Sequence, residues 1–112
     1  MRKVLIVEDE WLIGESLKDL LIGLGYEVLG PAPSCSMALE IISANRPDIA
    51  LVDLHLGTET CEAVLDDCAA KGVKVVLISA TAAEDLPEFC AGLLALGKPF
   101  GDDEVAAALI AA

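Results

Sequence analysis

Positive charge is scarce in this sequence. Seven Lys and Arg residues stand against 19 Asp and Glu, which gives a formal net charge of −12. Nucleic acids and anionic lipids are themselves negative, so binding either would need a local basic patch, and seven scattered cations do not form one. We therefore expect no nucleic-acid partner and no membrane partner.

Long apolar runs are also lacking. The longest, residues 105–112, has eight residues, whereas a membrane span needs about 18 or more. The first apolar run turns acidic after four residues, at Glu8, which is too early for a signal peptide. These absences predict a cytoplasmic protein.

Cysteine and histidine patterns typical of metal or redox sites are missing. The chain has four cysteines, no two of them in a CxxC pair, and a single histidine. This excludes the usual zinc sites and the thioredoxin-type motif. Cys61 and Cys68 flank Val64 and Leu65 at the spacing of one helix face, which predicts reduced thiols packed in the core.

What the sequence does contain is a regular alternation of short apolar runs and helix-period segments. Its 112 residues, 55% of them hydrophobic, suit one domain over residues 1–112, without further domains or disorder. Five continuous apolar runs predict strands covered on both faces: 4–7, 27–30, 49–52, 75–78 and 93–96. Five intervening or terminal segments predict helices: about 10–24, 34–46, 59–71, 84–90 and 102–112. Such alternation predicts an α/β fold, a doubly wound parallel sheet with helices on both faces.

Particular residues set the expected helix ends. Ser34 is the predicted N-cap of the second helix, and Gly72 the stop of the third. The fourth helix is expected to be short, and because Pro87 is tolerable only in the first turn of a helix, its start should lie near Pro87. Leu24 is expected on the buried side of the first helix, and Asp102 at the start of the last.

Acidic residues follow two of the predicted strands directly. Glu8 and Asp9 come after the first strand and Asp53 after the third, and the carboxyl ends of parallel strands meet at one edge of the sheet. Three converging carboxylates repel one another unless a divalent cation with oxygen ligands neutralises them, so we predict Mg2+ here. Ser79 and Lys98 follow the fourth and fifth strands. A carboxylate nucleophile, a metal, a hydroxyl and an ammonium group together favour reception of a phosphoryl group.

Four segments at these strand ends resemble the response-regulator receiver domain of two-component signalling. They are VLIVEDE (4–10), ALVDLHLG (50–57), VVLISA (75–80) and GKPF (97–100). The resemblance covers essentially the whole chain and implies a single-domain, chemotaxis-receiver-like protein. It also implies the flavodoxin-like (βα)5 fold, whose strand order is 2-1-3-4-5.

The resemblance implies roles for the acidic residues. Asp53 would be the phosphorylated residue, and Asp53 and Asp9 would bind Mg2+ directly. Glu8 would act through water, and the backbone carbonyl of His55 would be a further metal ligand. The chain would thus catalyse its own phosphorylation and dephosphorylation without being a conventional enzyme.

The resemblance also implies partners. Ser79 and Lys98 would contact the phosphoryl oxygens, and the Lys98–Pro99 peptide bond would be cis. The phosphodonor would be a phosphohistidine on a histidine kinase or a histidine phosphotransferase. The phosphorylated form would signal to an unidentified downstream protein.

The sequence departs from the family pattern at several points. Ala95 stands where receivers usually carry an aromatic residue, the stretch from Ser79 to Lys98 is short, and HLGTET (55–60) lacks the usual Pro and second Gly. These departures leave open a degenerate receiver that binds partners independently of phosphorylation. A phosphohydrolase of the haloacid-dehalogenase type is a weaker alternative, because its motif requires an Asp where His55 stands.

Two further residues have predicted roles. Trp11 lies off the apolar stripe of the first helix, and a large apolar side chain facing water beside a site suggests a partner surface. Receivers dock their kinases through this helix, so Trp11 is a candidate docking residue. His55 lies two residues after Asp53, where receivers place a side chain that tunes the lifetime of the phosphorylated form.

Overall fold

The computed structural model of the protein describes residues 2–56, 59–80 and 85–112. Seven strands are present in this part of the chain: β1 (Lys3–Val7), β2 (Glu27–Ala32), β3 (Ile49–Asp53), β4 (His55–Leu56), β5 (Glu59–Thr60), β6 (Lys74–Ser79) and β7 (Leu94–Gly97). The helices are α1 (Trp11–Gly23), α2 (Cys35–Asn45), α3 (Glu62–Lys71), the single-turn 3-10 helix η2 (Glu88–Cys90) and α4 (Asp102–Ala111).

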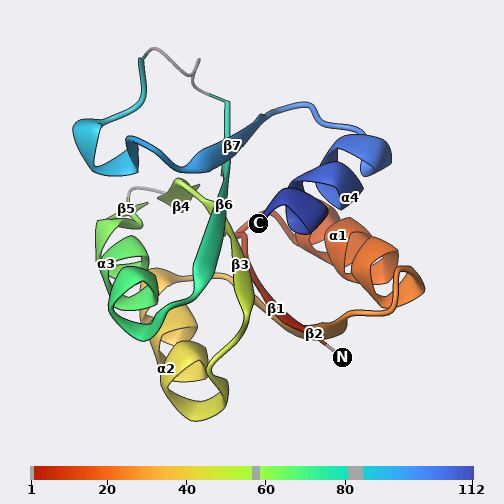
Figure 1. The fold of residues 1–112 in the computed structure, drawn as a ribbon, viewed down its shortest axis with the longest axis horizontal. Helices are drawn as coiled ribbons and strands as arrows, with labels where there is room; N and C mark the ends of the chain where they lie inside the picture. The colour runs from red at the N-terminus through yellow and green to blue at the C-terminus, as the bar shows by residue number, and fades with distance from the viewer. Residues whose placement is uncertain (1, 57–58, 81–84) are drawn as a thin grey trace.

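Five strands form one parallel sheet in the order β2-β1-β3-β6-β7. Numbered among themselves, they follow the order 2-1-3-4-5, so the expected fold class and strand order are confirmed. Helices α1 and α4 cover one face of this sheet, and α2 and α3 cover the other (Figure 1). Because all five strands run parallel, their carboxyl ends lie together at one edge of the sheet.

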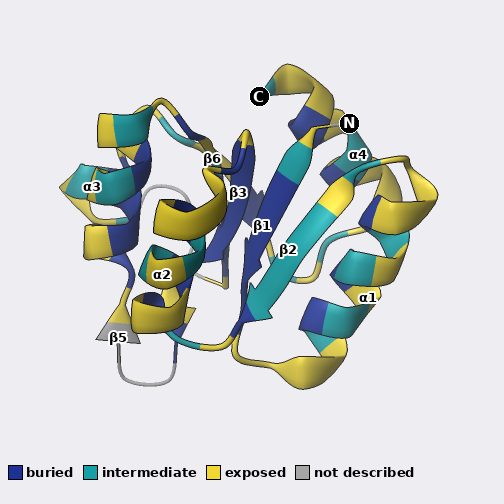
Figure 2. Ribbon diagram, turned by 90° about the horizontal axis from the view of Figure 1, so that it is seen from below, coloured by how far each residue is buried: buried dark blue, intermediate teal, exposed yellow. Residues whose placement is uncertain are grey.

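The core consists of two apolar layers, one on each face of the sheet. Alternate strand residues point to opposite faces: Leu5 and Val52 pack with α2 and α3, whereas Ile6 and Leu51 pack with α1 and α4. Strands β1 and β3 are largely buried (Figure 2). The two central strands, β1 and β3, which lead directly to the acidic residues, are therefore packed against helices on both faces of the sheet.

Most expected helix ends are confirmed. Ser34 caps α2 by accepting a hydrogen bond from the Met37 N–H at 3.2 Å. Gly72 ends α3 with a φ of 73°, a left-handed conformation that favours glycine. Among the described helices, none is both long enough and apolar enough to span a bilayer.

The third helix begins later than predicted, at Glu62 rather than residue 59. A small antiparallel hairpin of β4 and β5 precedes it. The Cys61 N–H donates a hydrogen bond to the Leu54 carbonyl at 3.2 Å. The chain thus folds back on Leu54 before the helix begins, which the sequence pattern did not indicate.

The fourth helix is short and starts next to Pro87 as predicted, but within the described residues it is only the single 3-10 turn η2; residue 84 of the predicted range lies outside the described residues. Pro87 is extended (φ −58°, ψ 154°) and Gly92 is left-handed (φ 82°), so only the single turn of η2 fits between them. The fifth strand of the sheet starts at Leu94, because the Leu93 N–H still closes a turn on the Cys90 carbonyl at 3.2 Å. Leu24, expected to be buried, is 47% exposed because it lies beyond the last turn of α1.

Candidate functional site

Three carboxylates converge at the carboxyl edge of the sheet. Glu8 and Asp9 directly follow β1, and Asp53 is the last residue of the neighbouring β3. One carboxylate oxygen from each of the three lies within 4.8 Å of the others. Glu8 and Asp53 are buried, at 2% and 4% exposure, whereas Asp9 is exposed. The acidic cluster is thus open to solvent on the side of Asp9.

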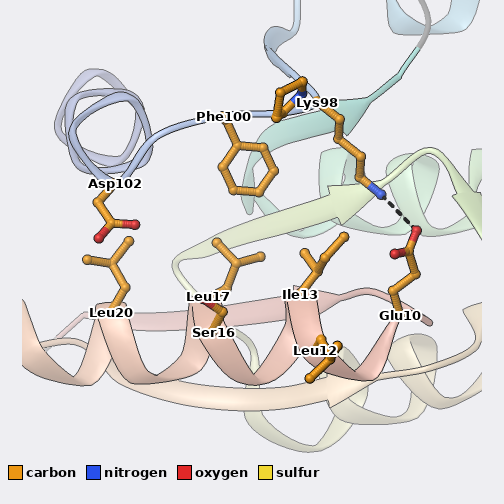
Figure 3. A pocket seen from close by; sticks show the side chains of 10 residues that line it. Glu10, Leu12, Ile13, Ser16, Leu17, Leu20, Lys98, Phe100 and Asp102 are labelled. Atoms are coloured by element: carbon orange, nitrogen blue, oxygen red, sulfur yellow. Dashed lines mark ion pairs between the residues drawn. The ribbon is translucent and has the colours of Figure 1, made fainter.

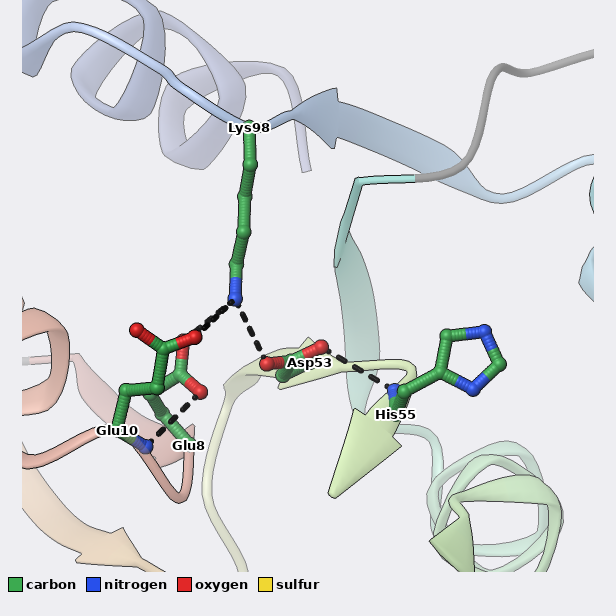
Figure 4. Close-up of polar contacts among 5 residues, drawn as sticks. All are labelled: Glu8, Glu10, Asp53, His55 and Lys98. Atoms are coloured by element: carbon green, nitrogen blue, oxygen red, sulfur yellow. Dashed lines mark hydrogen bonds and ion pairs between the residues drawn. The ribbon is translucent and has the colours of Figure 1, made fainter. Parts of the chain in front are cut away.

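Lys98, which follows β7, extends its side chain into this cluster (Figure 4). Its Nζ lies 2.9 Å from Asp53 Oδ2, 3.2 Å from Glu8 Oε1 and 3.7 Å from Glu10 Oε1. Burial by itself lowers the pKa of Lys98, but the hydrogen bonds and charges of Asp53 and Glu8 outweigh it and hold that pKa above its ordinary value. Lys98 is therefore a permanent cation beside the carboxylates.

Glu8 has one buried carboxylate oxygen that accepts no hydrogen bond. Its Oε2 accepts a hydrogen bond from the Glu10 N–H at 3.3 Å, but its buried Oε1 accepts none, although Lys98 lies 3.2 Å away. Burial, followed by the neighbouring carboxylate of Asp53, raises the pKa of Glu8 from 4.5 to about 7. A buried carboxylate without hydrogen bonds on one oxygen needs a further positive partner to remain ionised.

The cluster suits a small, hard divalent cation. Carboxylate oxygens are the ligands that Mg2+ prefers, and the buried Oε1 of Glu8 accepts no hydrogen bond, its charge being faced by Lys98 Nζ at 3.2 Å. The exposure of Asp9 leaves room for the water ligands that Mg2+ retains. The acidic residues are thus compatible with Mg2+ binding.

The other predicted site residues lie around this cluster. The His55 N–H donates a hydrogen bond to Asp53 Oδ1 at 3.2 Å, and its exposed imidazole points away from Asp53 (Figure 4). Ser79 is 2% exposed at the end of β6, next to β3. The Lys98 N–H donates to the Ser79 carbonyl at 3.0 Å, and the Lys98–Pro99 bond is cis as expected.

Sequence reasoning missed Glu10 as a member of the site. Its carboxylate reaches Lys98 across 3.7 Å although the residue itself is exposed. Glu10 directly precedes α1, so its position in VLIVEDE was the only available signal.

A pocket of about 550 Å³ extends from the site along α1. Figure 3 shows Glu10 and Lys98 at one end and Leu20 and Asp102 at the other, with the Phe100 ring facing α1. Trp11 lies beside it at the start of α1 and is 73% exposed. The predicted exposure of Trp11 is thus confirmed, although Trp11 does not line the pocket.

The response regulator receiver domain family matches residues 4–110. The chain belongs to this family. Over 96% of its length the receiver is 32% identical to the transcriptional regulatory protein PdtaR of Mycobacterium tuberculosis. It is also 38% identical, over 70% of its length, to the phyllosphere-induced regulator PhyR of Methylorubrum extorquens.

Solved structures agree with this assignment. A CheY-like receiver domain from Methylobacillus flagellatus superposes with a TM-score of 0.85 at 27% identity, covering 99% of this chain and 98% of the other. The receiver spans 55% of the length of PdtaR and 30% of that of PhyR. It is thus similar to part of each of these longer regulators, and it is a receiver domain of the response regulators of two-component systems.

Proposed function

We propose that residues 1–112 act as one phosphoacceptor domain, which takes a phosphoryl group from a phosphohistidine onto Asp53. The observation that carries this proposal is the 2.9 Å contact between Lys98 Nζ and Asp53 Oδ2 inside the group of three carboxylates. A nucleophilic carboxylate, a fixed cation and a set of metal ligands are the components that phosphoryl transfer requires.

In the proposed reaction, a carboxylate oxygen of Asp53 attacks phosphorus while the P–N bond of the phosphohistidine breaks. The bonding electron pair stays on the imidazole nitrogen, which takes up a proton. The products are an acyl phosphate on Asp53 and a neutral histidine on the donor. Asp53 then loses the phosphoryl group when water attacks the phosphorus, which regenerates the carboxylate and releases inorganic phosphate.

Lys98 and Ser79 would stabilise the charge on the transferred group. Lys98 already lies against Asp53, so its ammonium can move onto a phosphoryl oxygen without crossing the site. Ser79 ends the strand next to that of Asp53 and would supply a hydroxyl donor. Glu8, Asp9, Asp53 and the His55 carbonyl would hold Mg2+, which when bound offsets the negative charge of the phosphoryl oxygens.

The phosphodonor would be a histidine kinase or a histidine phosphotransferase, docked on α1. Trp11 and Leu12 are 73% and 75% exposed at the start of this helix, directly beside Glu10. Large apolar side chains exposed next to a reactive centre are typical of partner surfaces. A donor seated there would present its phosphohistidine to the acidic cluster.

The experiment treats the protein with acetyl phosphate and Mg2+ and measures the gain of one phosphoryl group by intact-mass spectrometry. We expect wild type to be labelled and Asp53→Asn to remain unlabelled. The matched control is Asp67→Asn, which removes an acid from a surface ion pair with Lys71 on α3 and should be labelled like wild type. Labelling of the Asp53→Asn variant would refute the assignment.

One observation favours a second function, that of a binding module independent of phosphorylation. Ala95 is exposed on β7 and carries no ring that could follow a movement of Ser79, and in the described residues 85–93 the fourth helix is reduced to the single turn η2. Such a module would bind its downstream protein equally well with and without beryllofluoride and Mg2+. A phosphoacceptor that signals through phosphorylation would bind the downstream protein with a different affinity in the presence of beryllofluoride and Mg2+ than in their absence.

A further inference from the structure

Two cysteines from distant parts of the chain meet thiol to thiol. Cys35 is the first residue of α2 and Cys61 is the residue that immediately precedes α3. They are 26 positions apart in the sequence, yet their Sγ atoms lie 3.0 Å from each other. The contact therefore joins the starts of two helices that cover the same face of the sheet.

The surroundings hold both sulfur atoms in place. Both residues belong to the apolar core between α2, α3 and the sheet, and Cys61 is fully buried. Cys35 is 8% exposed, and its thiol also lies 3.8 Å from the Thr60 carbonyl. Both residues are thus buried, and Cys35 is the less buried of the two.

The other two cysteines, Cys68 and Cys90, are not part of this contact. Burial raises the pKa of Cys68 to about 11 and that of Cys90 above its ordinary value. Thiols react with disulfides as thiolates, so these two are poor nucleophiles at neutral pH. They provide natural controls for the Cys35–Cys61 pair within the same chain.

We propose that Cys35 and Cys61 are a reactive dithiol that a low-molecular-weight disulfide, such as oxidised glutathione, converts into an intramolecular disulfide. A disulfide bond is about 2.05 Å long, so the two sulfur atoms need to approach by about 1 Å. The pair thus constitutes a modification site separate from the acidic cluster. Formation of this disulfide does not depend on whether Asp53 accepts a phosphoryl group.

The exchange takes two steps. The Cys35 thiolate attacks the external disulfide, forms a mixed disulfide and releases one molecule of glutathione as the thiol. The Cys61 thiolate then attacks the Cys35 sulfur and displaces the second glutathione. The two protein thiols are oxidised, the external disulfide is reduced, and the two protons end on the released thiols.

The test incubates the folded protein with oxidised glutathione and counts the remaining thiols after denaturation at acid pH. In wild type we expect the count to fall from four to two, and non-reducing peptide mapping to join the Cys35 peptide to the Cys61 peptide. A reductant should restore all four. A count that stays at four, or a bridge that includes Cys68 or Cys90, would overturn the proposal.

Variants separate this pair from general thiol oxidation. Cys68→Ala and Cys90→Ala should each fall from three thiols to one. Cys61→Ala should instead accumulate a single glutathione adduct on Cys35, because no second thiol is present to displace it. Persistent adducts on wild type in place of the internal bond would also refute the reasoning.

The thermal midpoint gives a second readout. The bond closes a loop across residues 35–61, which constrains the unfolded chain, so oxidised wild type should melt at least about 5 °C above its reduced form. Cys68→Ala should show the same rise on oxidation. Cys35→Ala should show none, and an equal rise in Cys35→Ala would contradict the proposed pairing.

Discussion

Without metal, Glu8 should make the stability of the folded protein fall as the pH rises from about 5 to 8. Its pKa is raised from 4.5 to about 7, so the native state holds this proton more tightly than the unfolded state. Stability from this source is complete below pH 4.5 and is lost as the pH rises through 7. Each tenfold difference in proton affinity corresponds to about 1.4 kcal/mol, so the loss approaches 3 kcal/mol. Because Glu8 is only 2% exposed, screening by water does little to reduce this loss of unfolding free energy.

Glu8→Gln removes the titrating group and keeps the shape of the side chain. In a chelator, urea denaturation followed by circular dichroism should show that the variant gains up to about 3 kcal/mol relative to wild type between pH 5 and pH 8. The control is Glu10→Gln, because the exposed carboxylate of Glu10 also faces Lys98. This replacement should alter the change in unfolding free energy between pH 5 and pH 8 by less than about 0.5 kcal/mol. Saturating Mg2+ at pH 8 should stabilise wild type more than Glu8→Gln. Parallel stability curves for wild type and Glu8→Gln would refute this account of the site.

Four more predictions concern separate features. Trp11→Ala should slow phosphotransfer from a histidine kinase by at least tenfold, as expected for a central apolar contact, while labelling by acetyl phosphate stays unchanged; slowing of both reactions would exclude a docking role. His55→Asn should change the lifetime of phosphorylated Asp53 severalfold in a chase experiment, because His55 lies directly beside Asp53 and its N–H already bonds Asp53 Oδ1; an unchanged lifetime would remove the hypothesis. Ser34→Ala removes the cap of α2 and should cost about 1 kcal/mol, or about 4 °C in thermal midpoint. Cys68→Ala should lose less stability than wild type between pH 9 and 11 in urea titrations, because the native thiol, with its pKa of about 11, stays protonated while the unfolded thiol ionises.

The sheet was predictable because its strands are continuous apolar runs. Leu5 on one face of the sheet and Leu51 on the other are both fully buried, and strands covered on both faces are what an uninterrupted VLIV or IALV indicates. The meeting of Glu8, Asp53 and Lys98 followed from the same logic, since each directly follows or ends a parallel strand.

Contacts that depend on local turns were not predictable. The β4–β5 hairpin rests on the hydrogen bond from the Cys61 N–H to Leu54, which leaves no periodic signal in the sequence. The proximity of Cys35 to Cys61 depends on that hairpin and on the docking of two helices. Glu10 joined the site through the reach of a long side chain, which spacing along the chain does not reveal.

The charge balance around Lys98 has a consequence for which phosphodonors can approach. The site holds four acids, Glu8, Asp9, Glu10 and Asp53, and this single ammonium group, so its charge is −3 when all five are ionised. That field attracts a divalent cation and repels a small free anion such as acetyl phosphate, and both effects weaken as ionic strength rises, since the Debye length is about 10 Å at 0.1 M salt. A protein donor held on α1 overcomes the repulsion with its own contact energy. Added salt should therefore speed phosphorylation by small anions relative to phosphorylation by a docked protein.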